Sequence, residues 1–213
     1  MKNICYIFGA SGEGLPYKFQ KGKNDLIIAA DGGYDYLVKN KIQPDIVMGD
    51  FDSSEFAKDS DISIKFPSEK DETDSFLAYI EGKNRGYRTF VFYGCLGGRT
   101  DHTLANLQML NHISQEGNRA IFVGNNEIVS AITEGTITYK KRKHGTISVF
   151  SADDISSGVT ISGLKYEVNN ASLTNTFPLG ISNEFVDKPA FISVQKGTLI
   201  IMENQSKDFS YYL

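Results

Sequence analysis

The sequence has few cysteines and histidines, and they form neither a disulfide nor a zinc pattern. Its 213 residues include two cysteines and three histidines. Two cysteines do not make the disulfide framework of a small secreted domain. Cys5 and Cys95 both lie inside apolar runs, so we expect buried free thiols. The histidines are scattered, which excludes a Cys/His zinc site of ordinary spacing. We therefore predict a cytoplasmic protein.

Long apolar runs and an excess of positive charge are also missing. The longest apolar runs, such as Ile4–Phe8 and Leu26–Ala30, are far shorter than the roughly 20 residues of a membrane-spanning helix. The first residues lead into a strand-like run rather than a signal peptide. With 22 basic and 26 acidic residues the net charge is −4, whereas a general nucleic-acid binder is usually basic. We expect no membrane and no nucleic-acid partner, but a small-molecule enzyme or binding protein.

Two common phosphate-binding fingerprints are absent as well. No Gly-x-x-x-x-Gly-Lys-Ser/Thr motif occurs, which excludes a P-loop. The stretch Gly9–Gly14 follows a strand-like run, but its glycines are in the wrong order for a dinucleotide fingerprint. The role of this loop stays open at the level of the sequence.

Residues 1–125 alternate apolar runs with helical stretches, which predicts an α/β domain with a mainly parallel, doubly wound sheet. The helices expected are 33–40, 73–84 with Phe76, Leu77 and Ile80 on one side, and 101–116 with leucines at every third position from Leu104. The strands expected are Ile4–Phe8, Leu26–Ala30, Asp45–Met48, Ile62–Phe66, Thr89–Tyr93 and Ala120–Val123.

Residues 126–213 alternate apolar and polar positions with period two, and glycines separate the runs. This pattern predicts an all-β sandwich domain, joined to the first by a short link near 124–130. The strands expected are 135–139, 145–150, 158–162, 191–194 and 198–202. The basic run Lys140–His144 is interpreted as a solvated hairpin tip, with an RNA or membrane patch as the alternative.

Four short stretches in the first domain follow or flank predicted strands and carry acidic residues or glycine pairs. They are Ala30–Gly33, Gly49–Ser53, Lys70–Asp74 and Gly97–His102. In open α/β sheets, ligands bind outside the carboxyl ends of the strands. We therefore predict that these stretches form a site there.

The aspartates of these stretches predict a cation site, made by Asp50, Asp52, Asp71, Asp74 and Asp101. Two carboxylates about 4 Å apart repel by about 4 kcal/mol at an effective dielectric of about 20, so a cation is expected among them. Carboxylates, water and phosphate oxygens are the ligands that Mg²⁺ prefers. The alternative for a single aspartate is a helix cap or turn, and Asp71 or Thr73 and Asp101 stand where caps are expected.

The glycine pairs predict a phosphate-binding role beside this cation site. Gly32 and Gly33 follow a strand and open a helix, and Gly97 and Gly98 precede Arg99 at another helix start. Glycine lets a backbone approach a ligand, and helix N-termini bind phosphate. The Arg99 guanidinium also matches phosphate oxygens.

In this order the four stretches resemble the thiamine pyrophosphokinase family. The matching segments are Ala30-Asp31-Gly32-Gly33, Gly49-Asp50-Phe51-Asp52-Ser53, Lys70-Asp71-Glu72-Thr73-Asp74, Gly97-Gly98-Arg99-Thr100-Asp101-His102 with its extension to Asn106, Gly163-Leu164-Lys165-Tyr166 and Gly180-Ile181-Ser182-Asn183-Glu184. The resemblance runs over nearly the whole chain.

The resemblance implies transfer of a diphosphate group from ATP to the hydroxyl of thiamine, with Mg²⁺, in a homodimer. The five aspartates would hold Mg²⁺ and take part in catalysis with Arg99. Residues expected at ATP are Asp31, Gly32, Gly33, Lys70, Thr73, Arg99 and His102. Residues expected at thiamine, partly across the dimer interface, are Ser162, Tyr166, Ser182 and Asn183. Some family members carry Trp where this chain has Tyr166.

Two other functions remain open from the sequence. The segment Asp50–Ser54 loosely resembles the nucleophile motif of haloacid dehalogenase-type phosphatases, although that motif normally follows the first strand and this one ends the third. A non-catalytic thiamine or nucleotide sensor is the second alternative, and the complete acidic set argues against it.

Overall fold

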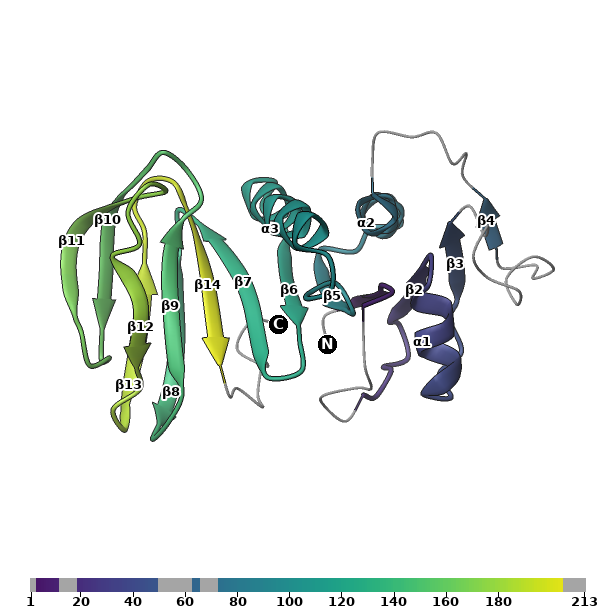
Figure 1. Ribbon diagram of the computed structural model, residues 1–213, viewed down its shortest axis with the longest axis horizontal. Helices are drawn as coiled ribbons and strands as arrows, with labels where there is room; N and C mark the ends of the chain where they lie inside the picture. The colour runs from purple at the N-terminus through teal and green to yellow at the C-terminus, as the bar shows by residue number, and fades with distance from the viewer. Residues whose placement is uncertain (1–2, 12–18, 50–62, 66–72, 205–213) are drawn as a thin grey trace. The chain divides into compact units, whose positions relative to one another are not determined.

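The computed structural model describes residues 3–11, 19–49, 63–65 and 73–204 (Figure 1). The chain divides into two compact units, residues 1–106 with 122–125 and residues 107–121 with 126–213. An α/β region is followed by an antiparallel β sandwich, which confirms the expected fold class. Within the described residues, no helix is long and apolar enough to cross a membrane.

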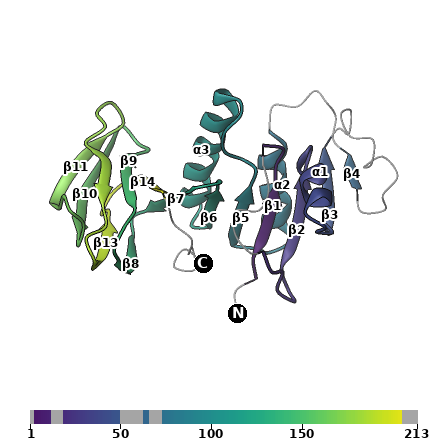
Figure 2. The same ribbon diagram turned by 60° about the horizontal axis from the view of Figure 1, so that its bottom comes forward.

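The first unit is built on parallel strands in the order β5-β1-β2-β3-β4. Figure 2 shows β1, β2 and β3 side by side. Because the strand order reverses at β1, the loops after β1 and β5 flank a topological switch point. The elements are β1 (Cys5–Phe8), β2 (Leu26–Ala30), α1 (Gly33–Lys39), β3 (Ile46–Gly49), β4 (Ser63–Lys65), α2 (Asp74–Asn84) and β5 (Thr89–Tyr93). Helix α3 (Thr100–Gln115) and β6 (Arg119–Val123) contribute residues to both units.

Helices α1 and α2 cover opposite faces of this sheet. Phe8 of β1 lies 5.8 Å, ring to ring, from Tyr36 of α1. On the other face, Cys5 of β1 lies beside Gly82 of α2, where a Cβ atom would come within 2.8 Å of the cysteine sulfur. Neighbouring strand residues point to opposite faces, so both sides of β1 are buried. This explains why the strand reads as continuously apolar.

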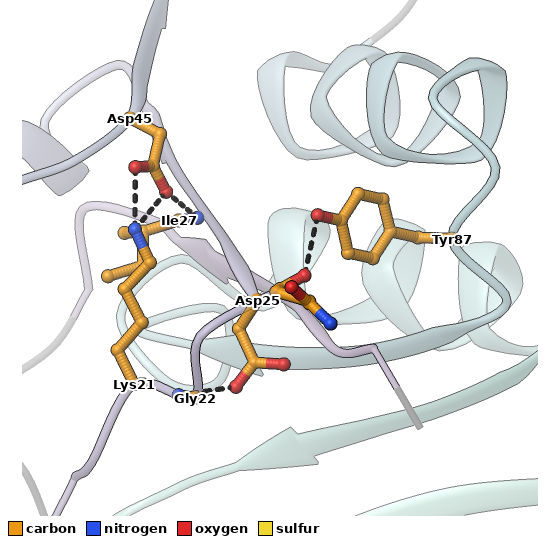
Figure 3. A network of polar contacts seen from close by, with 7 residues as sticks. Lys21, Gly22, Asp25, Ile27, Asp45 and Tyr87 are labelled. Carbon is orange, nitrogen blue, oxygen red and sulfur yellow. Dashed lines mark hydrogen bonds and ion pairs between the residues drawn. The ribbon is translucent and has the colours of Figure 1, made fainter. Parts of the chain in front are cut away.

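A network of polar contacts holds the segment that leads into β2 (Figure 3). The Asp45 carboxylate accepts hydrogen bonds from Lys21 Nζ, at 2.6 and 2.7 Å, and from the backbone N–H of Ile27, at 2.8 Å. Asp25 accepts from the backbone N–H of Gly22 at 2.7 Å. Asp25 and Asp45 directly precede β2 and β3, so these carboxylates serve the amino ends of the strands.

The strands of the second unit pair antiparallel in two sets, with the orders β12-β9-β14-β7, which is part of the ten-stranded sheet, and β11-β10-β13-β8, which is a sheet of its own. Inward and outward positions alternate along β8 and β9, as the period-two pattern predicts. The strands are β7 (Glu127–Thr133), β8 (Thr136–Arg142), β9 (Thr146–Ser151), β10 (Ile155–Ser162), β11 (Val168–Thr174), β12 (Gly180–Glu184), β13 (Lys188–Ser193) and β14 (Thr198–Asn204).

Three details of the sequence prediction are wrong. Strand β7 begins inside the expected link 124–130, and β11 and β12 were not predicted. Helix α2 buries Ala78, Tyr79 and Gly82 rather than the face with Phe76. The predicted helix 101–116 is confirmed as α3, in which Leu104 is 58% exposed while Leu110 is buried. A spacing of three drifts around a helix of 3.6 residues per turn, so these leucines do not share one face.

Candidate active site

A cavity of about 160 Å³ lies at the carboxyl ends of β1, β2 and β5, within the first unit. Its walls come from the loops after these strands, from the start of α2 and from the first two turns of α3. The lining residues are Gly9, Ala10, Ser11, Ala30, Asp31, Thr73, Asp74, Ser75, Gly94, Cys95, His102 and Asn106. The site therefore lies at the switch point of the sheet, where ligands of such folds bind.

Of the predicted ATP and metal residues, the cavity brings together Asp31, Thr73, Asp74 and His102. They come from three of the four stretches singled out in the sequence. Gly32, Gly33, Arg99 and Asp101 lie outside this lining. Asp50, Asp52, Lys70 and Asp71 fall outside the described residues, and their roles stay predictions.

Asp31 is held in an unusual backbone conformation at the end of β2. Its φ is +49°, in the left-handed region that few non-glycine residues adopt. Its backbone N–H donates to the Met48 carbonyl of β3 at 2.7 Å, and its own carbonyl accepts from the Tyr34 N–H at 3.2 Å. These contacts anchor the residue between β2, β3 and α1. The chain thus leaves the sheet with Asp31 on the cavity wall.

Gly33 allows the start of helix α1 to pack against the end of β1. A Cβ atom at this position would overlap the carbonyl oxygen of Phe8. Helix α1 therefore starts directly against the end of β1. Gly33 therefore permits a close approach to the backbone of Phe8 and Gly9. The sequence pattern does not distinguish such an approach from the approach of a ligand.

Thr73 begins helix α2 as its N-cap. Its hydroxyl oxygen accepts a hydrogen bond from the backbone N–H of Phe76 at 3.3 Å. The sequence analysis gave a helix cap as an alternative role for Thr73, and the structure confirms this cap. Asp74 follows in the first turn of the helix, where a carboxylate is favoured by the helix dipole. The start of α2 therefore supplies the cavity with a hydroxyl group, a carboxylate and a helix N-terminus.

Arg99 and Asp101 form a bidentate ion pair at the start of α3. Arg99 Nε and Nη2 donate to the two carboxylate oxygens at 3.1 and 2.6 Å. The backbone N–H of His102 also donates to Asp101, at 3.0 Å. The hydrogen bond from Arg99 is the main reason that the pKa of Asp101 lies below its ordinary value. Both side chains are exposed, so Arg99 is accessible to an anionic ligand.

Among the residues that the structure describes, no three acidic, histidine or cysteine side chains cluster closely enough to hold a metal ion. Asp31 and Asp74 do bring two carboxylates to one cavity. Oxygen donors of this kind suit Mg²⁺, which commonly uses one or two carboxylates with water and phosphate oxygens. The described donors therefore fit Mg²⁺.

Several cavity residues escaped the site prediction. Ser11 belongs to the loop that the sequence left unassigned, and Cys95 was expected only as a core thiol. Burial is the main reason that the pKa of the Cys95 thiol is raised to about 11. Asn106 donates from Nδ2 to the Cys95 carbonyl at 2.7 Å. The signal for Asn106 was its spacing of four from His102, which puts both on one helix face.

In the second unit, two predicted thiamine segments lie side by side. Leu164 and Phe185 form an antiparallel bridge, and the Lys165 N–H donates to the Glu184 carbonyl at 3.0 Å. The predicted residues Tyr166 and Asn183 come from these two segments. Residues 163–166 and 182–185 are called the paired segments below.

Asn183 joins the paired segments through its side-chain amide. Nδ2 donates to the Tyr166 carbonyl at 2.6 Å, and Oδ1 accepts from the N–H groups of Tyr166 and Glu184 at 3.0 and 2.9 Å. Asn183 is buried, while Tyr166 is 58% exposed. The buried amide thus fixes the backbone of an aromatic residue that faces solvent.

Of the two predicted serines, Ser162 directly precedes the first of the paired segments and Ser182 begins the second. Ser162 ends β10, and its hydroxyl donates to the Glu167 carboxylate at 3.4 Å. Ser182 has a φ of +59°, and its N–H donates to the Ser148 hydroxyl at 3.0 Å. Ser182 is exposed in β12, which leaves its side chain accessible to a ligand.

Two family models match this chain, one after the other. The first is thiamin pyrophosphokinase, catalytic domain, at residues 19–122. The second is thiamin pyrophosphokinase, vitamin B1 binding domain, at residues 134–199. The matches cover most of the chain and occur in the order that the sequence resemblance implied.

Individual relatives agree with the family models. Thiamine pyrophosphokinase of Bacillus subtilis is 27% identical, over 96% of this chain and 99% of that protein. Thiamin pyrophosphokinase 1 of Caenorhabditis elegans is 26% identical, over 83% of this chain and 78% of that protein. The crystal structure of the Bacillus subtilis protein matches with a TM-score of 0.85 and 25% identity, over 96% of this chain and 100% of that chain. The chain belongs to the thiamine pyrophosphokinase family.

Proposed function

We propose that this chain is an ATP:thiamine diphosphotransferase, which converts ATP and thiamine to AMP and thiamine diphosphate. The observation that carries the proposal is the succession of a catalytic and a vitamin B1 binding family match along one chain. The cavity at the switch point of the sheet supports the nucleotide half of the proposal. The exposed Tyr166, fixed by a buried amide, supports the thiamine half.

The reaction requires the thiamine hydroxyl oxygen to form a bond with the β-phosphorus of ATP. The bond from that phosphorus to the oxygen that bridges it to the α-phosphorus breaks, and AMP leaves with this oxygen and the electron pair. The hydroxyl proton passes to a base, for which we propose Asp74. Such transfers depend mainly on positioning and on stabilisation of charge. Arg99 would offset the negative charge of the phosphates, because its guanidinium is exposed at the start of α3.

For ATP, we propose contacts with the residues that the cavity brings together, Asp31, Thr73 and His102, with Gly32 and Gly33, which follow Asp31, and with Lys70. Helix α2 has 11 residues and opens onto the cavity through its cap at Thr73. A helix N-terminus attracts phosphate through its free N–H groups and its dipole. This supports placing the phosphates of ATP, rather than its adenine ring, near Thr73.

Mg²⁺ is the metal that we propose for this site. Asp74 would hold it, together with Asp50, Asp52, Asp71 and Asp101 of the acidic set. When bound, the ion would neutralise charge on the triphosphate. The hydrogen bond from Arg99 lowers the pKa of Asp101, which favours the ionised carboxylate that binds a cation.

For thiamine, we propose that the Tyr166 ring supplies a stacking surface and that Ser162 and Ser182 supply polar contacts. Asn183 engages its amide with the backbone of the paired segments, so we propose that it positions Tyr166. Thiamine is a cation, and an aromatic face attracts cations. A homodimer and a cytoplasmic location, expected from the resemblance and the composition, stay predictions.

The proposed function is tested by incubating the protein with ATP, Mg²⁺ and thiamine and separating the products by chromatography. We expect AMP and thiamine diphosphate in equal amounts, only when thiamine is present, and no product after chelation of the metal. Inorganic phosphate released without thiamine would instead indicate the phosphatase. Thiamine binding without turnover, measured by titration calorimetry, would indicate the sensor.

A pair of matched variants tests the cavity itself. Asp74→Asn removes the proposed base and metal ligand, and we expect turnover to fall by roughly 10²–10⁴-fold. Asp35→Asn is the control, because Asp35 is an exposed aspartate in the first turn of α1 and does not line the cavity. We expect this control to keep the wild-type rate. Equal rates in both variants would remove Asp74 from the mechanism.

A further inference from the structure

The basic run Lys140–His144 contains one side chain that is turned inward. The side chain of Arg142, the last residue of β8, is 20% exposed, whereas that of its neighbour Lys141 is 62% exposed. The interpretation of the whole run as a solvated hairpin tip is therefore wrong for Arg142. A guanidinium that is largely removed from water needs partners, and two of its three acceptors lie 61 and 62 residues away in the sequence.

The Arg142 guanidinium is held by three hydrogen bonds. Nη1 donates to Glu203 Oε2 at 2.7 Å, Nη2 to the Asn204 carbonyl at 3.0 Å, and Nε to the His144 carbonyl at 3.0 Å. The Glu203 side chain is fully buried. A planar guanidinium with its nitrogens engaged in this way has one orientation. The end of β8 is thereby tied to the end of β14, which belongs to the other sheet of the second unit.

The face of the guanidinium rests on Phe185. Its central carbon lies 4.4 Å from the centroid of the phenylalanine ring. Gly145 leaves the space for this arrangement, since a Cβ atom there would lie 3.0 Å from the same carbon. The Phe185 ring also meets the Tyr139 ring edge-on, at 5.5 Å. Phe185 is thus held between a cation and an aromatic ring.

Phe185 connects this cluster to the paired segments. It bridges to Leu164, and both residues are buried. Two residues earlier, Asn183 binds the backbone of Tyr166. Phe185 and Asn183 lie on the same segment. Holding Phe185 in place therefore also holds Asn183, whose side-chain amide binds the backbone of the exposed Tyr166.

We infer that Arg142 is a positioning residue for thiamine: its ion pair with Glu203 and its stacking on Phe185 hold the paired segments in the conformation that presents Tyr166. This inference rests on the proposed function, because it takes Tyr166 to contact thiamine. Arg142 itself touches no substrate in this arrangement. It acts through Phe185, and it belongs to the second unit, so the binding of ATP is independent of it.

The test compares Arg142→Lys with Lys141→Arg in the full-length protein. Arg142→Lys keeps a positive charge for Glu203 but loses the planar face and the forked donors. We expect the KM for thiamine, and the thiamine Kd from calorimetry, to rise about tenfold, since small displacements of positioned groups have effects of this size or larger. The KM for ATP is expected to stay within about twofold of the wild-type value. Lys141→Arg, on the exposed neighbour, is expected to match the wild type.

A double-variant cycle tests whether Arg142 acts through Phe185. Phe185→Leu is expected to raise the thiamine Kd to a similar degree, and the double variant is expected to be little worse than either single one. If Arg142→Lys does not fold, as judged by circular dichroism, Phe185→Leu alone tests the inference through its thiamine Kd.

The inference and the proposed function fail in different ways. If the wild type binds thiamine and Arg142→Lys melts earlier with an unchanged thiamine Kd, Arg142 is only structural and the inference is overturned. Equal effects on ATP and thiamine, or additive effects in the cycle, would overturn it as well. A wild-type protein that neither binds nor converts thiamine would overturn the proposed function, and the inference with it.

Discussion

Replacing Asn183 by alanine removes a polar side chain that is buried in the second unit. The substitution eliminates three hydrogen bonds, two with the Tyr166 backbone and one with the Glu184 N–H. No other side chain is altered, and the backbone of β12 accepts alanine without difficulty. The change therefore isolates what the amide contributes to joining the paired segments.

The magnitude follows from the number of hydrogen bonds. Each is worth about 1 kcal/mol net, so the free energy of unfolding is expected to fall by about 3 kcal/mol. For a chain of this length, this corresponds to a decrease in melting temperature of about 6–12 °C. The loss exceeds the typical effect of a surface substitution, which is within about 0.5 kcal/mol.

Thermal unfolding followed by circular dichroism measures this effect in the absence of any ligand. Asn175→Ala is the control, because the Asn175 amide donates to Asp154 at 3.2 Å on an exposed surface of the same unit. We expect the control to melt within about 2 °C of the wild type. If Asn183→Ala also melts within that range, water satisfies the freed backbone groups. The argument that Asn183 holds Tyr166 in place would then be refuted.

Two further predictions concern the first unit. Thr73→Ala removes the N-cap of α2 and is expected to lower the free energy of unfolding by about 1 kcal/mol in urea denaturation. Thr73→Ser is expected to restore it, and equal losses in both variants would exclude the cap as the cause. Arg99→Ala removes the main hydrogen bond that lowers the pKa of Asp101. We expect this pKa, followed by NMR, to rise toward its ordinary value, so that Asp101 gains its proton at higher pH than in the wild type. An unchanged pKa would show that the ion pair does not form in solution.

Strands buried on both faces were the easiest elements to predict. Leu26–Ala30 and Thr89–Tyr93 are apolar or β-branched at nearly every position, and all their residues are buried. Strands β11 and β12 were missed because each of them buries a single residue and therefore carries little apolar signal. An edge strand buries few side chains, so Val168–Thr174 carries several polar residues and has no periodic signal.

The buried face of α2 was decided by tertiary packing. The sequence favoured the large apolar residues Phe76 and Ile80, but the helix approaches the sheet at Gly82. A Cβ atom there would lie 2.8 Å from the Cys5 sulfur and 3.0 Å from the Phe90 ring. Such a close approach depends on the absence of a side chain, which a search for apolar residues does not detect.

The sequence by itself indicated where the candidate site lies, because four stretches with acidic residues or glycine pairs follow or flank predicted strands. It placed Asp31, Thr73, Asp74 and His102 at strand and helix ends, and parallel strands bring such ends together. Only the tertiary structure paired Arg142 with Glu203, which lie 61 residues apart. A hydrogen bond between distant residues leaves no local pattern, since it depends on two sheets closing on each other.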